Sequence, residues 1–346
     1  MRWIPATLLS LLLAATVPHA GAAEMTAHEK ALYEAAKAGN ETATWYESQY
    51  RTETAEAIGR AFREKYPGVG MNVIRSTAQV IFQRLSQDNR AGVTQCDVFS
   101  STDASHLVQL KQDGLLMKYV PENQAKAIEA FRTGDADGYF HTTQVSMVAL
   151  TYNTNLVKES EAPKTWLDLI DPKWKGQVSV GHPGFSGRVG NWVVAMRKMY
   201  GWEYFEKLEK NKPQIGRSIV DTVTMLTAGE RKVAAGSVSS TRPSIAQGNP
   251  LAIVYPTDGA LLMEDQSGIL KGTKNPNAAK LLMEFLLGIE KSEIAVADEN
   301  ESMRPEVKNP PGVPPIDSIK TFRVPADELA TGIPEVIEAW RDLFGV

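Results

Sequence analysis

The chain has 346 residues, with 37 Lys and Arg against 41 Asp and Glu, so its formal charge is −4 at pH 7. A nucleic-acid-binding protein would show an excess of basic residues, and this balance argues against that class. The single cysteine, Cys96, excludes an intrachain disulfide, so stability must come from hydrophobic cores, and the length allows two domains.

Residues 1–23 have the pattern of an export signal. Arg2 is the only charge before the apolar run at 8–15, and small residues follow at 20–23. The run is too short to span a membrane comfortably, and no cysteine at the junction indicates a lipid anchor. We therefore expect a cleaved signal peptide over 1–23 and a soluble periplasmic protein.

Three strand–helix pairs are predicted in the first part of the mature chain. The strands lie at 42–46, 70–74 and 96–99, and helices follow at 52–66, 75–85 and around 107–111. Alternation of this kind predicts a parallel sheet whose loops meet at the carboxyl ends of the strands. The polar residues of these loops are candidate ligand contacts: Ser48, Gln49, Ser76, Thr77, Ser101 and Thr102. Each hydroxyl has the simpler alternative role of capping its own helix, and Glu47 is interpreted as a surface turn residue.

Two further β-like runs are candidates for strands that cross between lobes. The first, at 143–155, is about twice the length of a typical strand and contains Tyr152. The second, at 251–257, contains Tyr255 and is followed by Asp258 in a Pro-Thr-Asp-Gly break. We include these three residues among the candidate ligand contacts.

The stretch at 175–192 predicts a strand, a glycine-bearing turn and a helix N-terminus. Ser186 is a suitable N-cap, and Ser186, Gly187 and Arg188 are candidate ligand contacts. Free N–H groups and the positive end of the helix dipole attract an anion there, and Arg188 adds a full charge. A similar arrangement follows the strand predicted at 233–238, where Ser240, Thr241 and Arg242 are the candidates. An ordinary capped helix is the alternative for each stretch.

Several segments carry a resemblance to a known family. They are FREKYPGVGMNVIRST (62–77), CDVFSSTDASHLVQLKQDGLL (96–116), TYNTNLV (151–157), APKTWLDLIDPKWKGQVSVGHP (162–183), IVYPTDGALL (253–262) and KNPNAAKLLMEFLLG (274–288). The chain resembles the extracellular solute-binding proteins of ABC importers, in the group that includes ferric-iron, thiamine, polyamine and organophosphate binders.

The resemblance implies an α/β fold of the two-lobe periplasmic-binding-protein type (type II). Each lobe would hold a mostly parallel sheet flanked by helices, and crossing hinge strands would join them. Lobe 1 would comprise 42–145 with 257–305, and lobe 2 would comprise 146–256 with 306–346. The expected partners are a small-molecule ligand and the transmembrane permease subunits, and the expected state is a monomer without a cofactor.

The expected ligand is a small anionic solute, either a phosphate or phosphonate or a carboxylate. Ferric-iron binders of this family place adjacent tyrosines where this chain has residues 239–242, Ser-Ser-Thr-Arg, which counts against iron. Arg188 and Arg242 provide guanidinium groups that suit such anions, and Asp258 would receive an amine if the ligand carries one. Ferric iron carried with an anion, thiamine and polyamines remain alternatives.

A hydrolase is the competing class of function. His182 lies near Ser186, but the Gly-Phe-Ser-Gly segment at 184–187 does not fit the G-x-S-x-G nucleophile elbow. Metal-binding and nucleotide-binding motifs are not found either. We therefore expect a binding protein with no catalytic residues and no metal site.

Overall fold

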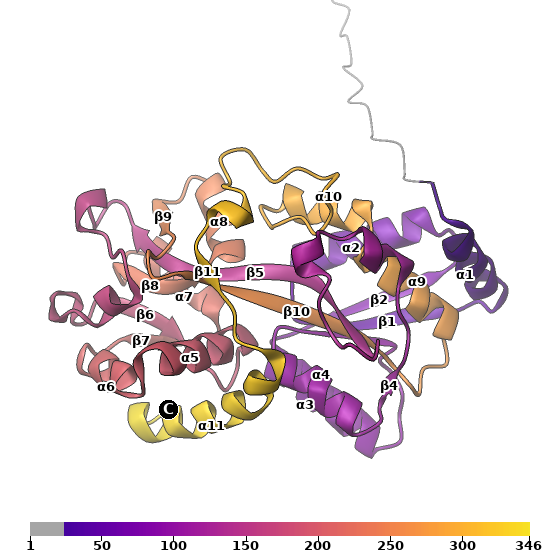
Figure 1. The fold of residues 1–346 in the computed structure, drawn as a ribbon, viewed down its shortest axis with the longest axis horizontal. Helices are drawn as coiled ribbons and strands as arrows, with labels where there is room; N and C mark the ends of the chain where they lie inside the picture. The colour runs from indigo at the N-terminus through magenta and orange to yellow at the C-terminus, as the bar shows by residue number, and fades with distance from the viewer. Residues whose placement is uncertain (1–23) are drawn as a thin grey trace, which may run out of the picture.

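The computed structural model describes residues 24–346, so the predicted signal peptide lies outside the described part of the chain. The strands form one mixed sheet with the order β2-β1-β3-β10-β5-β8-β6-β7, and β4, β9 and β11 pair at its sides. Figure 1 shows two lobes at the two ends of this sheet, with β5 and β10 running between them.

Lobe 1 contains the three strand–helix pairs predicted from the sequence. Its strands β1 (Thr42–Glu47), β2 (Gly70–Arg75) and β3 (Val98–Ser101) are parallel, and β4 (Leu116–Met117) is short. The helices of this lobe are α1 (Ala27–Ala38), α2 (Thr52–Lys65), α3 (Ala78–Arg90), α4 (Ala104–Gln112), α9 (Pro276–Leu286) and α10 (Ile289–Ala297). Ile58 and Phe62, one turn apart on α2, pack with Trp45 of β1 and Phe285 of α9 in the core.

Lobe 2 contains the second parallel series. Its strands are β6 (Val178–Gly181), β7 (Gln214–Gly216), β8 (Val233–Ser237) and β9 (Leu251–Val254), and its helices are α5 (Gly187–Tyr200), α6 (Glu203–Lys210), α7 (Ile219–Thr227) and α8 (Val238–Ala246). The C-terminal helix α11 (Ala326–Phe344) follows the short strand β11 (Thr321–Phe322). The core of this lobe is built around Trp166, Trp192, Phe205 and Trp340. Short 3₁₀ turns lie at Glu122–Lys126, Glu129–Phe131, Glu159–Glu161, Trp166–Ile170, Pro172–Trp174 and Ile316–Ser318.

Two long strands connect the lobes. The run predicted at 143–155 is β5 (Phe140–Asn153), which pairs with β10 in its first half and with β8 and β9 in its second. The second crossing predicted at 251–257 is wrong, because β9 pairs with β5 at the lobe 2 end only. The second long strand is β10 (Ala260–Leu270), which pairs with β5 and then with β3. The lobe boundaries remain a prediction, and the one at 145/146 falls inside β5.

Candidate functional site

The hollow where the two lobes meet is a cavity of ≈ 330 Å³. Its lining combines hydroxyls, arginines and two carboxylates: Ser48, Arg51, Thr52, Glu53, Arg75, Thr77, Ala78, Thr102, Ser186, Arg188, Ser218, Ile219, Val220 and Asp221. A smaller hollow of ≈ 10 Å³ shares Arg51, Arg75, Arg188 and Val220 with it, and adds Gln49, Tyr50, Ser239, Ser240, Asp298 and Asn300.

The N-terminal ends of four helices contribute to the cavity. Helices α2 and α3 begin there from lobe 1, α5 and α7 begin there from lobe 2, and Thr102 adds the loop that precedes α4. The N-cap residues of α3 and α5, Thr77 and Ser186, make no side-chain hydrogen bond to their own helix. The start of α7 is closed by a capping box between Ser218 and Asp221. Helix N-termini carry partial positive charge and unpaired N–H groups, so this arrangement favours an anion.

Arg188 links three parts of the molecule. Its Nη2 donates to Oδ2 of Asp265 on β10 and to the carbonyl oxygen of Gln49 in lobe 1, both at 2.8 Å. The side chain of Asp265 is fully buried, and this burial raises the pKa of its carboxyl group, although the neighbouring Arg188 opposes the shift. Arg188 is 7 % exposed, and its Nε has no partner within the described residues.

Two more arginines face the cavity from lobe 1. Arg75, at the end of β2, donates from Nε to the carbonyl oxygen of Tyr50 at 3.0 Å. Arg51, the N-cap of α2, forms an ion pair with Asp298. The cavity therefore combines three guanidinium groups with the four helix N-termini.

Charged groups also lie buried beside this cavity. Glu47 is fully buried, and its Oε2 accepts from the backbone N–H groups of Gln49 and Tyr50 at 2.8 and 3.1 Å. The interpretation of Glu47 as a surface turn residue was wrong, because it is the last residue of β1 and its side chain turns inward. Burial disfavours the charged form of this carboxyl group and raises the pKa of Glu47 to about 7.

Lys291 is a second buried charged residue. Burial disfavours its charged form too and lowers the pKa of Lys291 to about 7. Its Nζ donates to the carbonyl oxygen of Thr143 at 2.6 Å.

Seven of the predicted contact residues lie at these two hollows. Five line the larger cavity: Ser48, Thr77, Thr102, Ser186 and Arg188. Gln49 and Ser240 line the smaller one. The predicted convergence of loop ends is therefore present for part of the set.

Other predicted residues lie near the cavity but line neither hollow. Ser76 donates its backbone N–H to the carbonyl oxygen of Glu47. Ser101 belongs to β3, where its Oγ is 2.9 Å from Nδ1 of His106. Gly187 begins α5 and lies against the backbone of residues 102–103. Thr241 lies inside α8 and not in the loop before this helix, and its hydroxyl donates to the carbonyl oxygen of Ser237.

Arg242 and Tyr255 lie together in a different place. Arg242 pairs with Glu301 at 2.6 Å and donates to the hydroxyl of Tyr255 at 2.7 Å. These two residues line a separate hollow of ≈ 390 Å³ beneath the loop at 311–314. Arg188 and Arg242 are therefore not brought into one cavity.

Tyr152 and Asp258 serve the packing of lobe 2. Tyr152 is 5 % exposed and belongs to the hydrophobic core of that lobe. Asp258 accepts from the backbone N–H of Trp166 at 2.9 Å and from the hydroxyl of Tyr200. The carboxylates that do line the cavity are Glu53 and Asp221.

Both ring nitrogens of His182 contact backbone atoms. Nδ1 accepts from the N–H of Gly184 at 2.9 Å, and Nε2 is 3.1 Å from the carbonyl oxygen of Val346. The ring does not orient the Ser186 hydroxyl, so the geometry gives no support to a His–Ser hydrolase.

Sequence reasoning missed Arg51, Arg75 and the start of α7. Arg75 directly precedes the predicted loop residues Ser76 and Thr77, and this position was a signal that it lies at the same sheet edge. Ser218 with Asp221 is the capping-box pattern, and it lies shortly after β7.

Metal ligands do not gather in the part of the chain that the structure describes. Within residues 24–346, no group of three or more His, Cys, Asp or Glu side chains is placed to hold a metal ion. Phenolate oxygens do not gather either: the hydroxyl of Tyr46 donates to Asp88, and Tyr152 and Tyr255 occupy the separate positions given above. Among the same residues, no helix is long and apolar enough to cross a membrane.

Comparison with known proteins identifies relatives in sequence and in fold. A putative 2-aminoethylphosphonate-binding periplasmic protein of Salmonella typhimurium is 22 % identical over 260 residues, which cover 71 % of this chain and 70 % of that protein. The periplasmic binding protein AfuA from Actinobacillus pleuropneumoniae, solved with fructose-6-phosphate bound, has a TM-score of 0.78 at 22 % identity and covers 88 % of this chain and 99 % of its own. Iron-bound HitA from Pseudomonas aeruginosa has a TM-score of 0.76 at 22 % identity, with coverage of 87 % and 99 %.

These likenesses confirm the expected type II periplasmic-binding-protein fold. The sequence model described as bacterial extracellular solute-binding protein matches residues 95–330, which is more than half of the chain. The protein therefore belongs to the family of bacterial extracellular solute-binding proteins.

Proposed function

We propose that this protein captures a small organic phosphate or phosphonate in the cavity between its lobes. The observation that carries the proposal is the meeting of Arg51, Arg75 and Arg188 with four helix N-termini around one cavity. Solute-binding proteins of this family bind small ligands and interact with the permease of an ABC transporter. We further propose that the mature chain acts as a monomer in the periplasm and delivers its ligand to such a permease.

The strength expected of these contacts suits a transport protein. A hydrogen bond to a charged group contributes about 1.5–3 kcal/mol net. Micromolar affinity corresponds to about 8 kcal/mol, so three to five such bonds are sufficient. Arg75 and Arg188 lie in different lobes, and a phosphoryl group has enough oxygens to accept from both.

The carboxylates of the cavity favour a ligand that also carries an amine. Glu53 is exposed at its edge, and Asp221 lines it from the first turn of α7. A relative is named for 2-aminoethylphosphonate, which has both signs of charge, and AfuA binds a sugar phosphate without an amine. Both ligand types contain the phosphoryl oxygens that the arginines would bind.

Calorimetry and thermal shift on the mature protein test the proposal. The panel contains 2-aminoethylphosphonate, ethylphosphonate, fructose-6-phosphate, inorganic phosphate, ferric citrate, thiamine and spermidine. We expect a phosphonate or phosphate ester to raise the melting temperature, since a ligand that binds only the folded state stabilises it. Arg75→Ala should weaken that binding at least about tenfold, the equivalent of one lost charged contact.

Arg60→Ala is the matched control, because Arg60 is on the exposed face of α2 with a surface partner, Glu56. It should bind like the parent. Equal binding by the Arg75→Ala variant would contradict the proposed site. The amine is tested by the pair of phosphonates, since ethylphosphonate lacks only that group.

Ferric iron is the alternative that the panel addresses directly. Iron-bound HitA has the same fold. Fe(III) prefers phenolate and carboxylate oxygens, and the cavity lining contains no tyrosine. Stabilisation by ferric citrate alone would favour iron over an organic phosphate, and stabilisation by thiamine or spermidine alone would favour those alternatives.

A further inference from the structure

The two lobes are in close contact at Gly187. A Cβ atom at this position would lie 2.7 Å from the backbone nitrogen and the Cβ of Asp103, and 2.8 Å from the carbonyl carbon of Thr102. Two of these three atoms are backbone, so they do not move aside by a rotamer change. One turn along α5, the amide of Asn191 is 3.5 Å from the carbonyl oxygen of Thr102. The N-terminus of α5 therefore rests on the segment that joins β3 to α4.

The requirement for glycine comes from the other lobe and not from the local backbone. Gly187 is the first residue of α5, and its backbone is not in the left-handed region that disfavours side chains. Alanine is a better helix former than glycine by about 1 kcal/mol in helix interiors. A methyl group at position 187 would therefore be neutral or favourable for the helix itself, and the three atoms nearest to it would belong to Thr102 and Asp103 of lobe 1.

The next residue connects this contact to the cavity. Arg188 reaches Asp265 and the carbonyl oxygen of Gln49 from the same turn of α5. Ordinary contact with a methyl group needs about 3.5–4 Å, so a Cβ at 187 would force the lobes apart by about 1 Å here. The same displacement would withdraw Arg188 from its partners in lobe 1 and from the cavity.

We propose that Gly187 is a positioning residue that sets how closely the two lobes approach, and thereby places Arg188 against the bound solute. Its own contribution is the absence of a side chain. The ligand used in the second experiment below rests on the proposed function, but the lobe approach itself does not.

The first experiment measures lobe separation by electron spin resonance. Spin labels are attached to Glu56→Cys on α2 and Thr224→Cys on α7, two exposed positions on helices that begin at the cavity from opposite lobes. Cys96 is 1 % exposed and should not be labelled. Distances are recorded for the protein alone, with 2-aminoethylphosphonate, and with ferric citrate.

In the labelled parent we expect a short-distance population that one of these ligands increases. Gly187→Ala should remove that population and shift the distribution to longer distances. Gly272→Ala, in the turn after β10 where a Cβ would meet the side chain of the exposed Thr94, should behave like the parent. An unchanged distribution in the Gly187→Ala variant would overturn the inference.

The second experiment measures binding kinetics of 2-aminoethylphosphonate. Gly187→Ala should raise the dissociation rate about tenfold or more and leave the association rate within about twofold, because closure follows encounter. The melting temperature of the ligand-free variant should equal or exceed that of the parent. A large loss of stability would also overturn the inference, since the glycine would then be required inside lobe 2.

The two proposals fail in different ways. If ferric citrate and not the phosphonate increases the short-distance population of the parent, the ligand assignment fails. The effect of Gly187→Ala on lobe separation is then measured in the presence of ferric citrate. If the phosphonate binds parent and variant equally and both close, the ligand assignment stands and the role of Gly187 fails.

Discussion

Arg188 is held at the binding cavity by the residues to which it is hydrogen-bonded. Its guanidinium faces the cavity, yet one of its nitrogens is shared between Asp265 and a carbonyl oxygen. A buried guanidinium without such a partner would be costly. The ion pair holds Arg188 in place, while Nη1 has no hydrogen-bond partner among residues 24–346, so the residue can be both fixed and available to an anion.

Glu47 is the second buried charge beside the site, and its environment predicts a pH dependence. The groups near it are Arg75 from β2, Arg188 from α5, Asp265 from β10, and Tyr50, with Lys291 beyond Asp265. Burial raises the pKa of Glu47 from 4.5 to about 7, so the folded protein holds this proton more tightly than the unfolded chain. The resulting stabilisation is complete below about pH 4.5 and is lost as pH rises through 7.

Glu47→Gln should remove this contribution. Because the shift spans 4.5 to about 7, the free energy of unfolding of the parent, relative to the variant, should fall by about 3 kcal/mol between pH 4.5 and 8. Urea unfolding at a series of pH values measures the difference. Glu53→Gln, the same change at an exposed position of α2, is the control. A flat difference for Glu47→Gln would show that Glu47 titrates normally.

At the level of elements, β10 explains what sequence reasoning could and could not find. The strand–helix pairs of both lobes and the long strand β5 were predicted close to their observed bounds, because apolar runs and turn residues mark them. β10 was not predicted as a crossing strand, since its centre, Glu264–Ser267, is polar and resembles a loop. Asp265 and Ser267 are nevertheless buried, because their hydrogen-bond partners come from β3, β5 and α5.

Contacts with residues that are distant in the sequence also limited the prediction of the site. Ser48, Thr77, Thr102, Ser186 and Arg188 follow strands or begin helices, and this local pattern placed them correctly at the cavity. Arg242 fits the pattern equally well but pairs with Glu301, which is 59 positions away. Local sequence gives no information on partners at such separations, so it could not distinguish the two arginines.

Asp265 is expected to be the most sensitive position on β10. Asp265→Asn leaves the buried guanidinium of Arg188 without its counter-charge, and breaking a buried pair in this way costs about 3–5 kcal/mol. The midpoint of urea unfolding at pH 7 should fall accordingly. Glu264→Gln is a control one residue away on the same strand, where the partner, Arg323, is 36 % exposed.

Surface pairs of that kind contribute about 0–1 kcal/mol, so the control should lose little stability. The double variant Asp265→Asn with Arg188→Met should recover part of the loss, because it removes the unpaired charge. Equal losses for Asp265→Asn and Glu264→Gln would show that the Arg188–Asp265 pair contributes no more than a surface contact.

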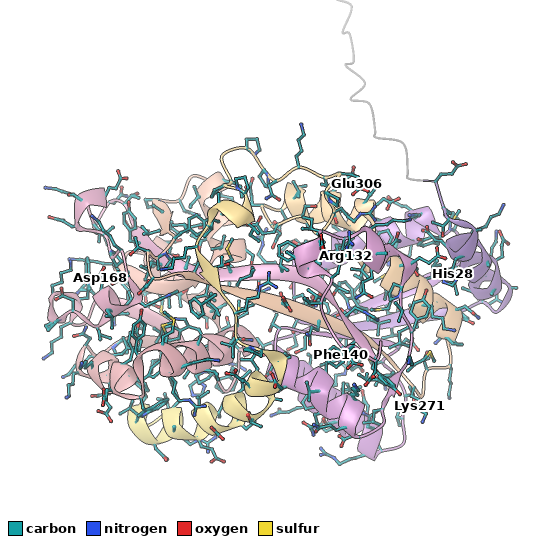
Figure 2. All side chains as sticks on the ribbon, in the orientation of Figure 1. His28, Arg132, Phe140, Asp168, Lys271 and Glu306 are labelled. Carbon is teal, nitrogen blue, oxygen red and sulfur yellow. The ribbon has the colours of Figure 1, made fainter. Side chains whose placement is uncertain are left out.

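At the scale of the whole molecule, three elements belong to both lobes. β5 and β10 pair with each other over residues 140–148 and 261–268, and each continues into the part of the sheet that belongs to one lobe. Helix α11 packs on α5 of lobe 2 and on α4 of lobe 1, although the sequence suggested lobe 2 alone. Figure 1 shows α11 beneath α5, extending toward α4. In Figure 2, Asp168 and His28 mark the far ends of the two lobes, and Phe140 marks the start of β5.

This continuity predicts that the lobes unfold together. Unfolding either lobe alone would strip one end of both long strands of its neighbours and expose one side of α11, so an intermediate with one folded lobe is costly. Calorimetry of the ligand-free mature protein should give one transition, with a ratio of calorimetric to van't Hoff enthalpy of about 1. Hydrogen exchange should give the amides of β1 in lobe 1 and β6 in lobe 2 the same free energy of opening, within about 1 kcal/mol.

The C-terminal helix provides the variant that tests the cause. Trp340 is fully buried on α11, where it packs against Phe205 and Phe344, and Trp340→Ala should cost about 3–5 kcal/mol. If the lobes are coupled, this loss should lower the opening free energy of β1 as much as that of β6, although Trp340 lies in the core of lobe 2. A decrease confined to β6, or two separate calorimetric transitions, would mean that the two lobes unfold independently although they share β5 and β10.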